Sequence, residues 1–224
     1  MAARSRPSAM DIDHELVFKV LLISEFSAFS VVRIVYQQIS ARAGRRTVIS
    51  ESRRYAAFLS IFICYEVFTF FMFIFWPQWF AWARIELPLG VRWTGAIIGL
   101  LSLVIFVWVH RSLGMNLSAT LKIKEAHALV TDGPYRWVRH PMYTAFFLLH
   151  IGALLMTANW FIGGTWTAGL LLVLIFRVRR EEEMLLRYFG DQYRKYMART
   201  PRFIPTFPDY LCKGVLRDHR SLRD

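Results

Sequence analysis

The chain has 224 residues, 55% of them hydrophobic, and a formal net charge of +12. The apolar residues fall in long blocks rather than at the periodic spacing of a soluble core, which favours membrane spans. The basic residues flank these blocks and no nucleic-acid motif is present, so the charge indicates contact with anionic lipid and argues against nucleic-acid binding. Cys64 lies inside an apolar block, and the two cysteines Cys64 and Cys212 form neither a disulfide framework nor a metal-ligand spacing.

Five apolar blocks predict five transmembrane helices. In chain order they cover residues 16–36, 55–76, 91–109, 141–157 and 160–176. Each block is near the roughly 20 residues that cross a bilayer core, although the last two are at the short end. Ala158 and Asn159 alone separate these two, which predicts a tight C-terminal helical hairpin. The expected fold is an all-α, polytopic membrane protein.

The arginines and lysines predict the orientation of these helices in the membrane. They gather between the first and second helices, between the third and fourth, and in the C-terminal tail. The loop between the second and third helices has only Arg84 and Arg92, and the turn at Asn159 is uncharged. Because cytoplasmic segments carry the excess of basic residues, the N-terminus is expected outside and the final hairpin is expected to open towards the cytoplasm.

Two polar clusters bracket the predicted hairpin. The first is the glycine- and proline-containing segment 127–143, and the second is the charged segment 177–183. Polar groups are costly to keep in lipid, so both clusters are candidates for one functional site on the cytoplasmic face. Residues 181–200 follow with apolar side chains near helical spacing and predict an amphipathic helix or helix pair at that surface. The expected organisation is a three-span region over 1–110, a functional core over 111–205 and a basic tail over 206–224.

The residue types in these clusters limit the chemistry. No nucleophile stands beside a base in a familiar order, and neither a phosphate-binding loop nor a dinucleotide-binding glycine motif is present. Hydrogen-bonding aromatics, histidines and a Gly-Pro turn suit a polar, nucleotide-like cofactor beside a lipid-facing cleft. In the N-terminal helices, Glu25, Arg33 and Glu66 are expected to form interhelical pairs or to line a polar cavity.

The two clusters together resemble a known family. The pattern combines His127-x-Leu129-Val130-x-x-Gly133-x-Tyr135, then Arg139-His140-Pro141-x-Tyr143, then Glu181-Glu182-Glu183 before Phe189-Gly190. It is similar to the isoprenylcysteine carboxyl methyltransferases, and the related phospholipid methyltransferases share a looser version. The resemblance covers about residues 113–205. It implies a membrane enzyme that transfers a methyl group from S-adenosylmethionine to the carboxylate of a prenylated cysteine or a similar lipid-like substrate.

The resemblance also implies roles for individual residues. Arg177 is expected beside the substrate as the catalytic residue, and no metal is expected. The cofactor is expected to contact His127, Ala128, Leu129, Val130, Tyr135, His140, Pro141, Met142, Tyr143 and Glu181. Met142 and Ala145 depart from the family pattern, which often has a small residue and a glycine at these positions.

Two other functions fit parts of the pattern. A methyltransferase for a phospholipid amine would need a base to remove the proton of the amine, and His140 or a glutamate would supply it. A sterol-type reductase using NADPH has a comparable C-terminal hairpin. This chain is far shorter than those reductases and has Pro141-Met142 within the motif.

Overall fold

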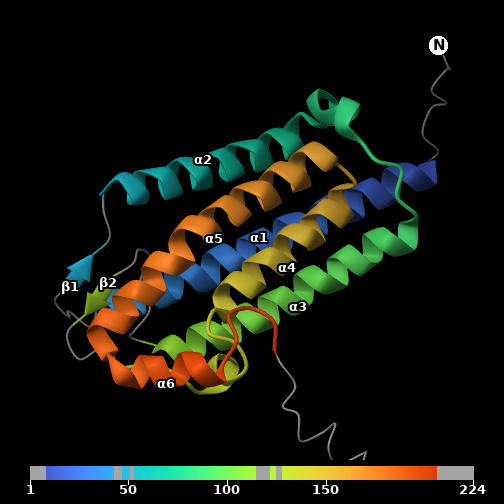
Figure 1. Ribbon diagram of the computed structural model, residues 1–224. Coiled ribbons are helices and arrows are strands. Elements are labelled where there is room, and N and C mark those ends of the chain that lie inside the picture. The colour runs from blue at the N-terminus through green and yellow to red at the C-terminus, as the bar shows by residue number, and fades with distance from the viewer. Residues whose placement is uncertain (1–8, 43–46, 51–52, 115–121, 125–127, 206–224) are drawn as a thin grey trace, which may run out of the picture.

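The fold is a bundle of long helices (Figure 1), seen in a computed structural model that describes residues 9–42, 47–50, 53–114, 122–124 and 128–205. The long helices are α1 (Ala9–Arg42), α2 (Arg53–Phe75), α3 (Leu89–Leu113), α4 (Pro141–Thr157) and α5 (Trp160–Phe189). The shorter ones are η1 (Pro77–Ala83), η3 (Gly133–Arg136) and α6 (Asp191–Arg199). The predicted all-α class is confirmed.

A small antiparallel ladder is not predicted from the sequence. Strand β1 (Thr47–Ser50) pairs with β2 (Lys122–Lys124). Thr47 stands opposite Lys124, and Ser50 stands opposite Lys122. The ladder joins the connection between α1 and α2 to the connection between α3 and α4.

Within the described residues, three helical segments are long and apolar enough to cross a membrane: Ala56–Phe75, Leu89–Leu113 and Trp160–Phe189. Helix α4 is apolar but has only 17 residues. Helix α1 is 34 residues long, and it carries Lys19, Glu25 and Arg33 among its apolar side chains. The count of five spans therefore stays a prediction, although each predicted block coincides with a helix.

Helix α5 is longer than the sequence predicts. The predicted end at residue 176 is wrong, because the helix continues to Phe189 and its buried face continues through Arg177, Val178 and Glu182. The charged segment that suggests a membrane boundary is therefore helical throughout. Gly190 ends α5 with a backbone φ of +54°, a left-handed conformation that glycine adopts readily. Helix α6 follows directly and buries Tyr193 and Tyr196 on one face.

Helices α3 and α4 form the tightest contact of the bundle. A Cβ atom placed on Gly95 would lie 2.9 Å from the carbonyl oxygen of Gly152, and one placed on Gly152 would lie 3.0 Å from the amide nitrogen of Gly99. Only residues without side chains allow such an approach, as is common between membrane helices. Helix α1 packs on this pair through Phe18, Leu22 and Phe29, which belong to two hydrophobic clusters.

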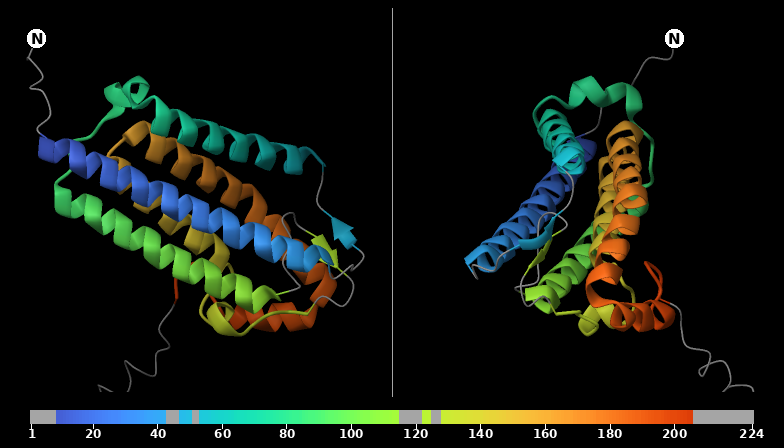
Figure 2. Two further views of the ribbon diagram at one scale, coloured as in Figure 1. Left: turned by 180° about the vertical axis from the view of Figure 1, so that it is seen from behind. Right: turned by 60° about the vertical axis from the view of Figure 1, so that its left-hand side comes forward.

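Helix α2 is fastened to the hairpin by polar side chains. The Tyr65 hydroxyl donates to Thr165 Oγ1 over 2.8 Å, and Trp166 Nε1 donates to Thr69 Oγ1 over 2.8 Å. Between them, Glu66 Oε1 lies 2.6 Å from Nε2 of His150 on α4, so the pairing expected for Glu66 is present. Figure 2 shows α1 and α2 on one side of the bundle and α4 and α5 on the other.

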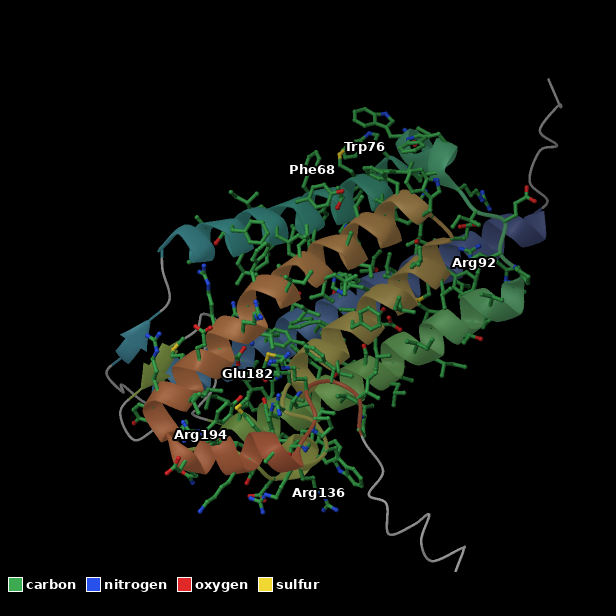
Figure 3. All side chains as sticks on the ribbon, in the orientation of Figure 1. Phe68, Trp76, Arg92, Arg136, Glu182 and Arg194 are labelled. Atoms are coloured by element: carbon green, nitrogen blue, oxygen red, sulfur yellow. The ribbon has the colours of Figure 1, made fainter. Side chains whose placement is uncertain are left out.

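Charged side chains hold each end of the bundle, and Figure 3 labels Arg92 and Glu182 at these opposite ends. Arg92 is counted above with the charges of the loop, although it falls at the start of the predicted helix 91–109, and the structure places it buried in α3. Its Nη1 donates to Glu15 Oε1 over 2.8 Å, and its Nη2 donates to the carbonyl oxygen of Met156 over 2.7 Å. A buried guanidinium needs these partners, so the positive charge of Arg92 serves packing here rather than membrane orientation.

At the opposite end, the chain after α6 folds back onto the start of α4. The amide of Arg139 donates to the carbonyl oxygen of Pro201 over 2.8 Å, and the amide of His140 donates to that of Arg202 over 3.0 Å. The buried Glu182 carboxylate accepts from Arg139 Nη2 over 2.9 Å and from Arg202 Nη2 over 2.7 Å. These ion pairs with Glu182 raise the pKa of Arg202.

Labelling of single cysteines tests the predicted orientation. In a background without Cys64 and Cys212, Arg136→Cys and Gln192→Cys should react with an impermeant maleimide only from the cytoplasmic side. Gln78→Cys, at the other end of the bundle, should react only from the opposite side. All three side chains are exposed. Reaction of Arg136→Cys and Gln78→Cys from the same side would contradict the arrangement.

Glu182→Gln tests the ion-pair cluster at the end of the bundle. The substitution keeps the shape of the side chain but leaves Arg139 buried without a carboxylate, and it should lower the free energy of unfolding by about 3 kcal/mol. Glu183→Gln is the matched control, because Glu183 is exposed one position along the same helix. Thermal unfolding in detergent measures both. Equal stability of the two variants would remove the structural role of Glu182.

Candidate functional site

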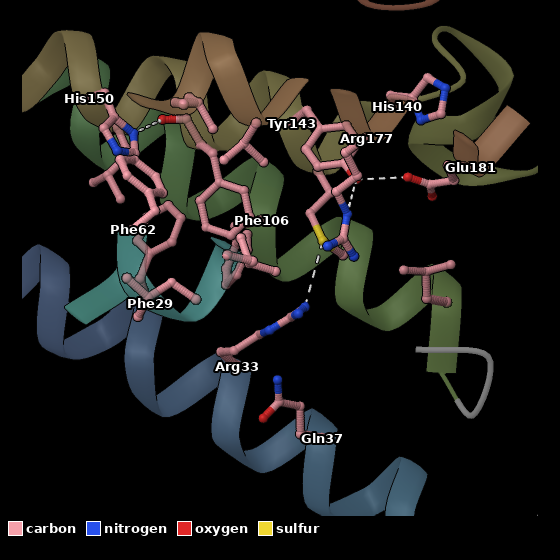
Figure 4. A pocket seen from close by; sticks show the side chains of 18 of the residues that line it. Phe29, Arg33, Gln37, Phe62, Phe106, His140, Tyr143, His150, Arg177 and Glu181 are labelled. Carbon is pink, nitrogen blue, oxygen red and sulfur yellow. Dashed lines mark hydrogen bonds between the residues drawn. The ribbon is translucent and has the colours of Figure 1, made fainter. Parts of the chain in front are cut away.

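A cavity of about 840 Å³ lies inside the bundle, between α1 and α2 on one side and α4 and α5 on the other (Figure 4). Its lining changes character along the helices. Tyrosine, histidine, arginine and glutamate side chains gather near the end that holds η3 and α6. Phenylalanine and aliphatic side chains form most of the remaining lining, which also includes the paired Glu66 and His150. The cavity therefore has a polar zone and an apolar zone.

The start of α4 places the side chains of His140 and Tyr143 in the polar zone. Pro141 is fully buried at the first helical position, where a proline lacks only a donor that has no helical partner. His140 precedes it and is buried, with Nε2 3.2 Å from Glu182 Oε1. Met142 and Tyr143 follow on the cavity side. The Glu182 cluster thus fixes the position of the His140 ring beside the cavity.

A chain of hydrogen bonds crosses the polar zone from α5 to α4 and back. Arg177 Nε donates to the Tyr143 hydroxyl oxygen over 2.6 Å, and that hydroxyl donates to Glu181 Oε2 over 2.7 Å. Arg177 and Glu181 are one helical turn apart, so both project from the same face of α5. Arg177 is only 7% exposed. These bonds therefore hold the Arg177 cation and the Glu181 anion at fixed positions, bridged by the Tyr143 phenol.

Tyrosines from outside the hairpin complete the polar zone. Tyr135 of η3 and Tyr193 and Tyr196 of α6 all line it, and the Tyr196 hydroxyl donates to the backbone oxygen of Tyr135 over 2.6 Å. Burial, and then the negative charge of Glu181, raise the pKa of Tyr135, so this phenol stays protonated as a donor. The hydroxyl of Tyr193 is buried and has no hydrogen-bond partner among the described residues. A polar ligand in the cavity would supply that partner.

The apolar zone extends two helical turns from the polar zone. The polar end is marked by Arg33 on α1, Tyr143 on α4 and Arg177 on α5. The apolar end is marked by Phe26, His150 and Leu170 on the same three helices, each seven residues away. Seven residues of α-helix rise about 10 Å. Four large apolar lining residues are also exposed on the outside of the bundle: Val31 on α1 and Ile63, Val67 and Phe71 on α2. The cavity therefore opens between α1 and α2, on a side that a lipid bilayer would cover.

The structure brings most of the sequence-predicted site residues to this cavity. The predicted residues that line it are Ala128, Leu129, Val130, Tyr135, His140, Met142, Tyr143, Arg177 and Glu181. Pro141 does not line it and is instead buried in the first turn of α4. His127 lies outside the described residues. The cavity thus collects one set of side chains from two segments far apart in the sequence.

Other residues at the site are not assigned to it from the sequence. Glu182 is the buried member of the Glu181–Glu183 run, and the helical spacing from the buried Val178 could have identified it. Arg33 and Glu66 are expected at a polar cavity, but no sequence signal places them in the same cavity as Arg177. Gln37 lies one turn beyond Arg33 on α1 and also lines the cavity.

Part of this chain is similar in sequence to known proteins. Residues 93–187 match the profile of the isoprenylcysteine carboxyl methyltransferase (ICMT) family. The chain is 38% identical over 89 residues to the protein-S-isoprenylcysteine O-methyltransferase of Schizosaccharomyces pombe, covering 39% of this chain and 37% of that protein. It is 38% identical over 96 residues to the enzyme of the same name from Homo sapiens, covering 42% of this chain and 31% of that protein.

The fold also has a solved relative. A structure of the eukaryotic intramembrane Ras methyltransferase ICMT superposes with a TM-score of 0.51 at 26% identity, covering 83% of this chain and 62% of that protein. The matched regions span well under half of the two curated relatives. Profile, sequence and fold agree, and the resemblance predicted from the sequence is confirmed: residues 93–187 are similar to the isoprenylcysteine carboxyl methyltransferase family.

Proposed function

We propose that this protein transfers a methyl group from S-adenosylmethionine to the carboxylate of a prenylated cysteine in a membrane. One observation carries the proposal: a single cavity joins a polar zone that contains Arg177, Tyr143 and Glu181 to an apolar zone that opens between α1 and α2. A substrate with a carboxylate at one end and an isoprenoid chain at the other matches both zones. The names of the sequence relatives point to the same reaction.

The donor set of the polar zone suits S-adenosylmethionine. Glu181 offers a carboxylate to ribose hydroxyls or to the amino group, and Tyr135 and Tyr193 offer phenols. Ala128, Leu129 and Val130 contribute a segment without regular secondary structure at the same place. The buried Tyr193 hydroxyl, which has no partner among the described residues, fits a polar ligand. When bound, the cofactor would supply an electrophilic methyl group on a sulfonium.

The residues of the cavity can then act on the acceptor without a general base. The pKa of a free carboxylic acid is near 4 or below, so the nucleophile is ionised at neutral pH. Arg177 can hold a carboxylate with its planar guanidinium, and Tyr143 fixes that guanidinium through Nε. Methyl transfer is an in-line displacement, so such positioning supplies much of the rate enhancement.

The apolar zone would hold the isoprenoid chain. Its walls carry Phe26, Phe29, Phe62 and Phe70, which bury apolar surface. A chain that comes from lipid gains nothing by leaving water, so these walls must match the lipid in polarity and hold the chain by close packing. The opening between α1 and α2 lets the chain arrive laterally from the bilayer. We place the polar zone at the cytoplasmic face, as the arginine distribution of the sequence favours.

Glu181→Gln tests the cofactor zone. Replacing the charged acceptor should weaken S-adenosylmethionine binding roughly tenfold or more, since a hydrogen bond to a charged group contributes about 1.5–3 kcal/mol. Glu183→Gln should bind the cofactor like the wild type, because Glu183 does not line the cavity. Isothermal calorimetry in detergent gives both dissociation constants. Unchanged affinity in Glu181→Gln would remove Glu181 from the cofactor site.

Arg177→Lys and a pH profile test the nature of the nucleophile. The lysine keeps the charge but loses the planar fork, so turnover of a farnesyl-cysteine analogue should fall at least about tenfold. Cofactor affinity should stay near that of the wild type. The wild-type rate should be flat from about pH 6 to 8, because a carboxylate is ionised throughout that range.

The competing reaction gives a different profile. An amine acceptor such as phosphatidylethanolamine must lose a proton first, so its rate would climb steeply through neutral pH. Such a climb, together with activity retained in Arg177→Lys, would reject the carboxylate acceptor in favour of the amine.

A further inference from the structure

A second arginine faces the cavity from the opposite wall. Arg33 lies on α1, outside the segment 93–187 that matches the family profile, and its side chain lines the cavity. Among the described residues, the one hydrogen-bond partner of its guanidinium is Met142 Sδ, 3.6 Å from Nη1. A thioether sulfur is a weak acceptor and carries no charge. The charge of Arg33 is therefore not neutralised by an ion pair within the described part of the chain.

Arg33 lies across the pocket from Arg177, at the polar zone. Figure 4 shows Arg33 and Arg177 pointing toward one another across the pocket, one from α1 and the other from α5. Gln37, one turn further along α1, lines the same zone. Met142, which accepts the bond from Arg33, is the neighbour of Tyr143, which accepts the bond from Arg177. The two guanidinium groups thus approach one space from opposite sides.

A cationic side chain without a carboxylate partner is expensive in a membrane helix, and such a residue commonly marks a binding site. Two guanidinium groups that face one space repel each other, and an anion between them relieves both the repulsion and the desolvation of Arg33. We propose that Arg33 is a substrate-binding residue that holds the acceptor carboxylate together with Arg177. This inference rests on the proposed function and assigns selection of the acceptor partly to α1.

The test compares an acid with its neutral analogue. N-acetyl-farnesylcysteine and its carboxamide share the prenyl chain and differ in charge at the position that the two arginines would contact. The wild type should bind the acid more tightly than the carboxamide. Arg33→Gln should weaken binding of the acid roughly tenfold or more and leave the carboxamide unchanged, because only the acid makes a charged hydrogen bond. Arg33→Lys should recover part of the preference.

Arg42→Gln is the matched control, since Arg42 is exposed on the same helix and does not line the cavity. It should keep the wild-type preference, and all variants should bind S-adenosylmethionine alike if they are folded. An unchanged preference in Arg33→Gln would overturn the role of Arg33 while leaving the proposed function intact. Failure of the wild type to methylate or prefer the acid would reject the proposed function itself. Tight binding of phosphatidylethanolamine that depends on Arg33, without a preference for the acid, would assign the anion to a phosphate and overturn the carboxylate.

Discussion

The buried carboxylate of Glu182 holds together the segments that build the polar half of the cavity. A lone charge in a protein interior would be strongly unfavourable, but Glu182 is bonded to Arg139 from the start of α4 and to Arg202 from the chain after α6. His140 lies against the same carboxylate. Because Glu182 is occupied in this way, the residue before it, about 100° around the helix, is directed elsewhere. Glu181 faces the cavity and binds Tyr143.

Helix α5 therefore presents two surfaces with different tasks. One surface carries Glu182 and stabilises the end of the bundle, and the other carries Arg177 and Glu181 into the cavity. One helical turn, about 5–6 Å of rise, separates Arg177 from Glu181. In the proposed reaction that rise sets the acceptor carboxylate beside Arg177 and the cofactor groups beside Glu181, with the Tyr143 phenol between them. Reaction by in-line displacement depends on such a fixed separation.

The helices and their local boundaries could be predicted from the sequence, because the signals are local. Apolar blocks coincide with α1 to α5, Asn159 caps α5 by accepting from the amide of Ile162, and Gly190 ends the same helix. The length of α5 could not be predicted, since a run of charges normally marks a membrane boundary, whereas here Arg177 and Glu182 of that run are buried inside the protein. The pairing of Glu182 depends on Arg139 and Arg202, which are distant in sequence and come close to it only in the folded chain.

The two walls of the cavity also differ in how far their residues could be predicted from the sequence. Most of its polar zone comes from α4 and α5, within the segment that matches the family profile, and the resemblance therefore predicts most of those residues. The facing wall comes from α1 and α2, which lie outside that segment. No motif assigns Arg33 or Glu66 to a common cavity.

Glu66 also limits the apolar zone. It is paired with His150 at the far end, where an unpaired carboxylate would be strongly disfavoured against an isoprenoid chain. Because these two side chains bind each other, the carboxylate has a partner at this end of the zone, and α2 is fixed to α4 at the same point. Helices α1 and α2, outside the matched segment, thus form one wall of the apolar zone and its opening, while in the proposed reaction α4 and α5 would hold the reacting groups.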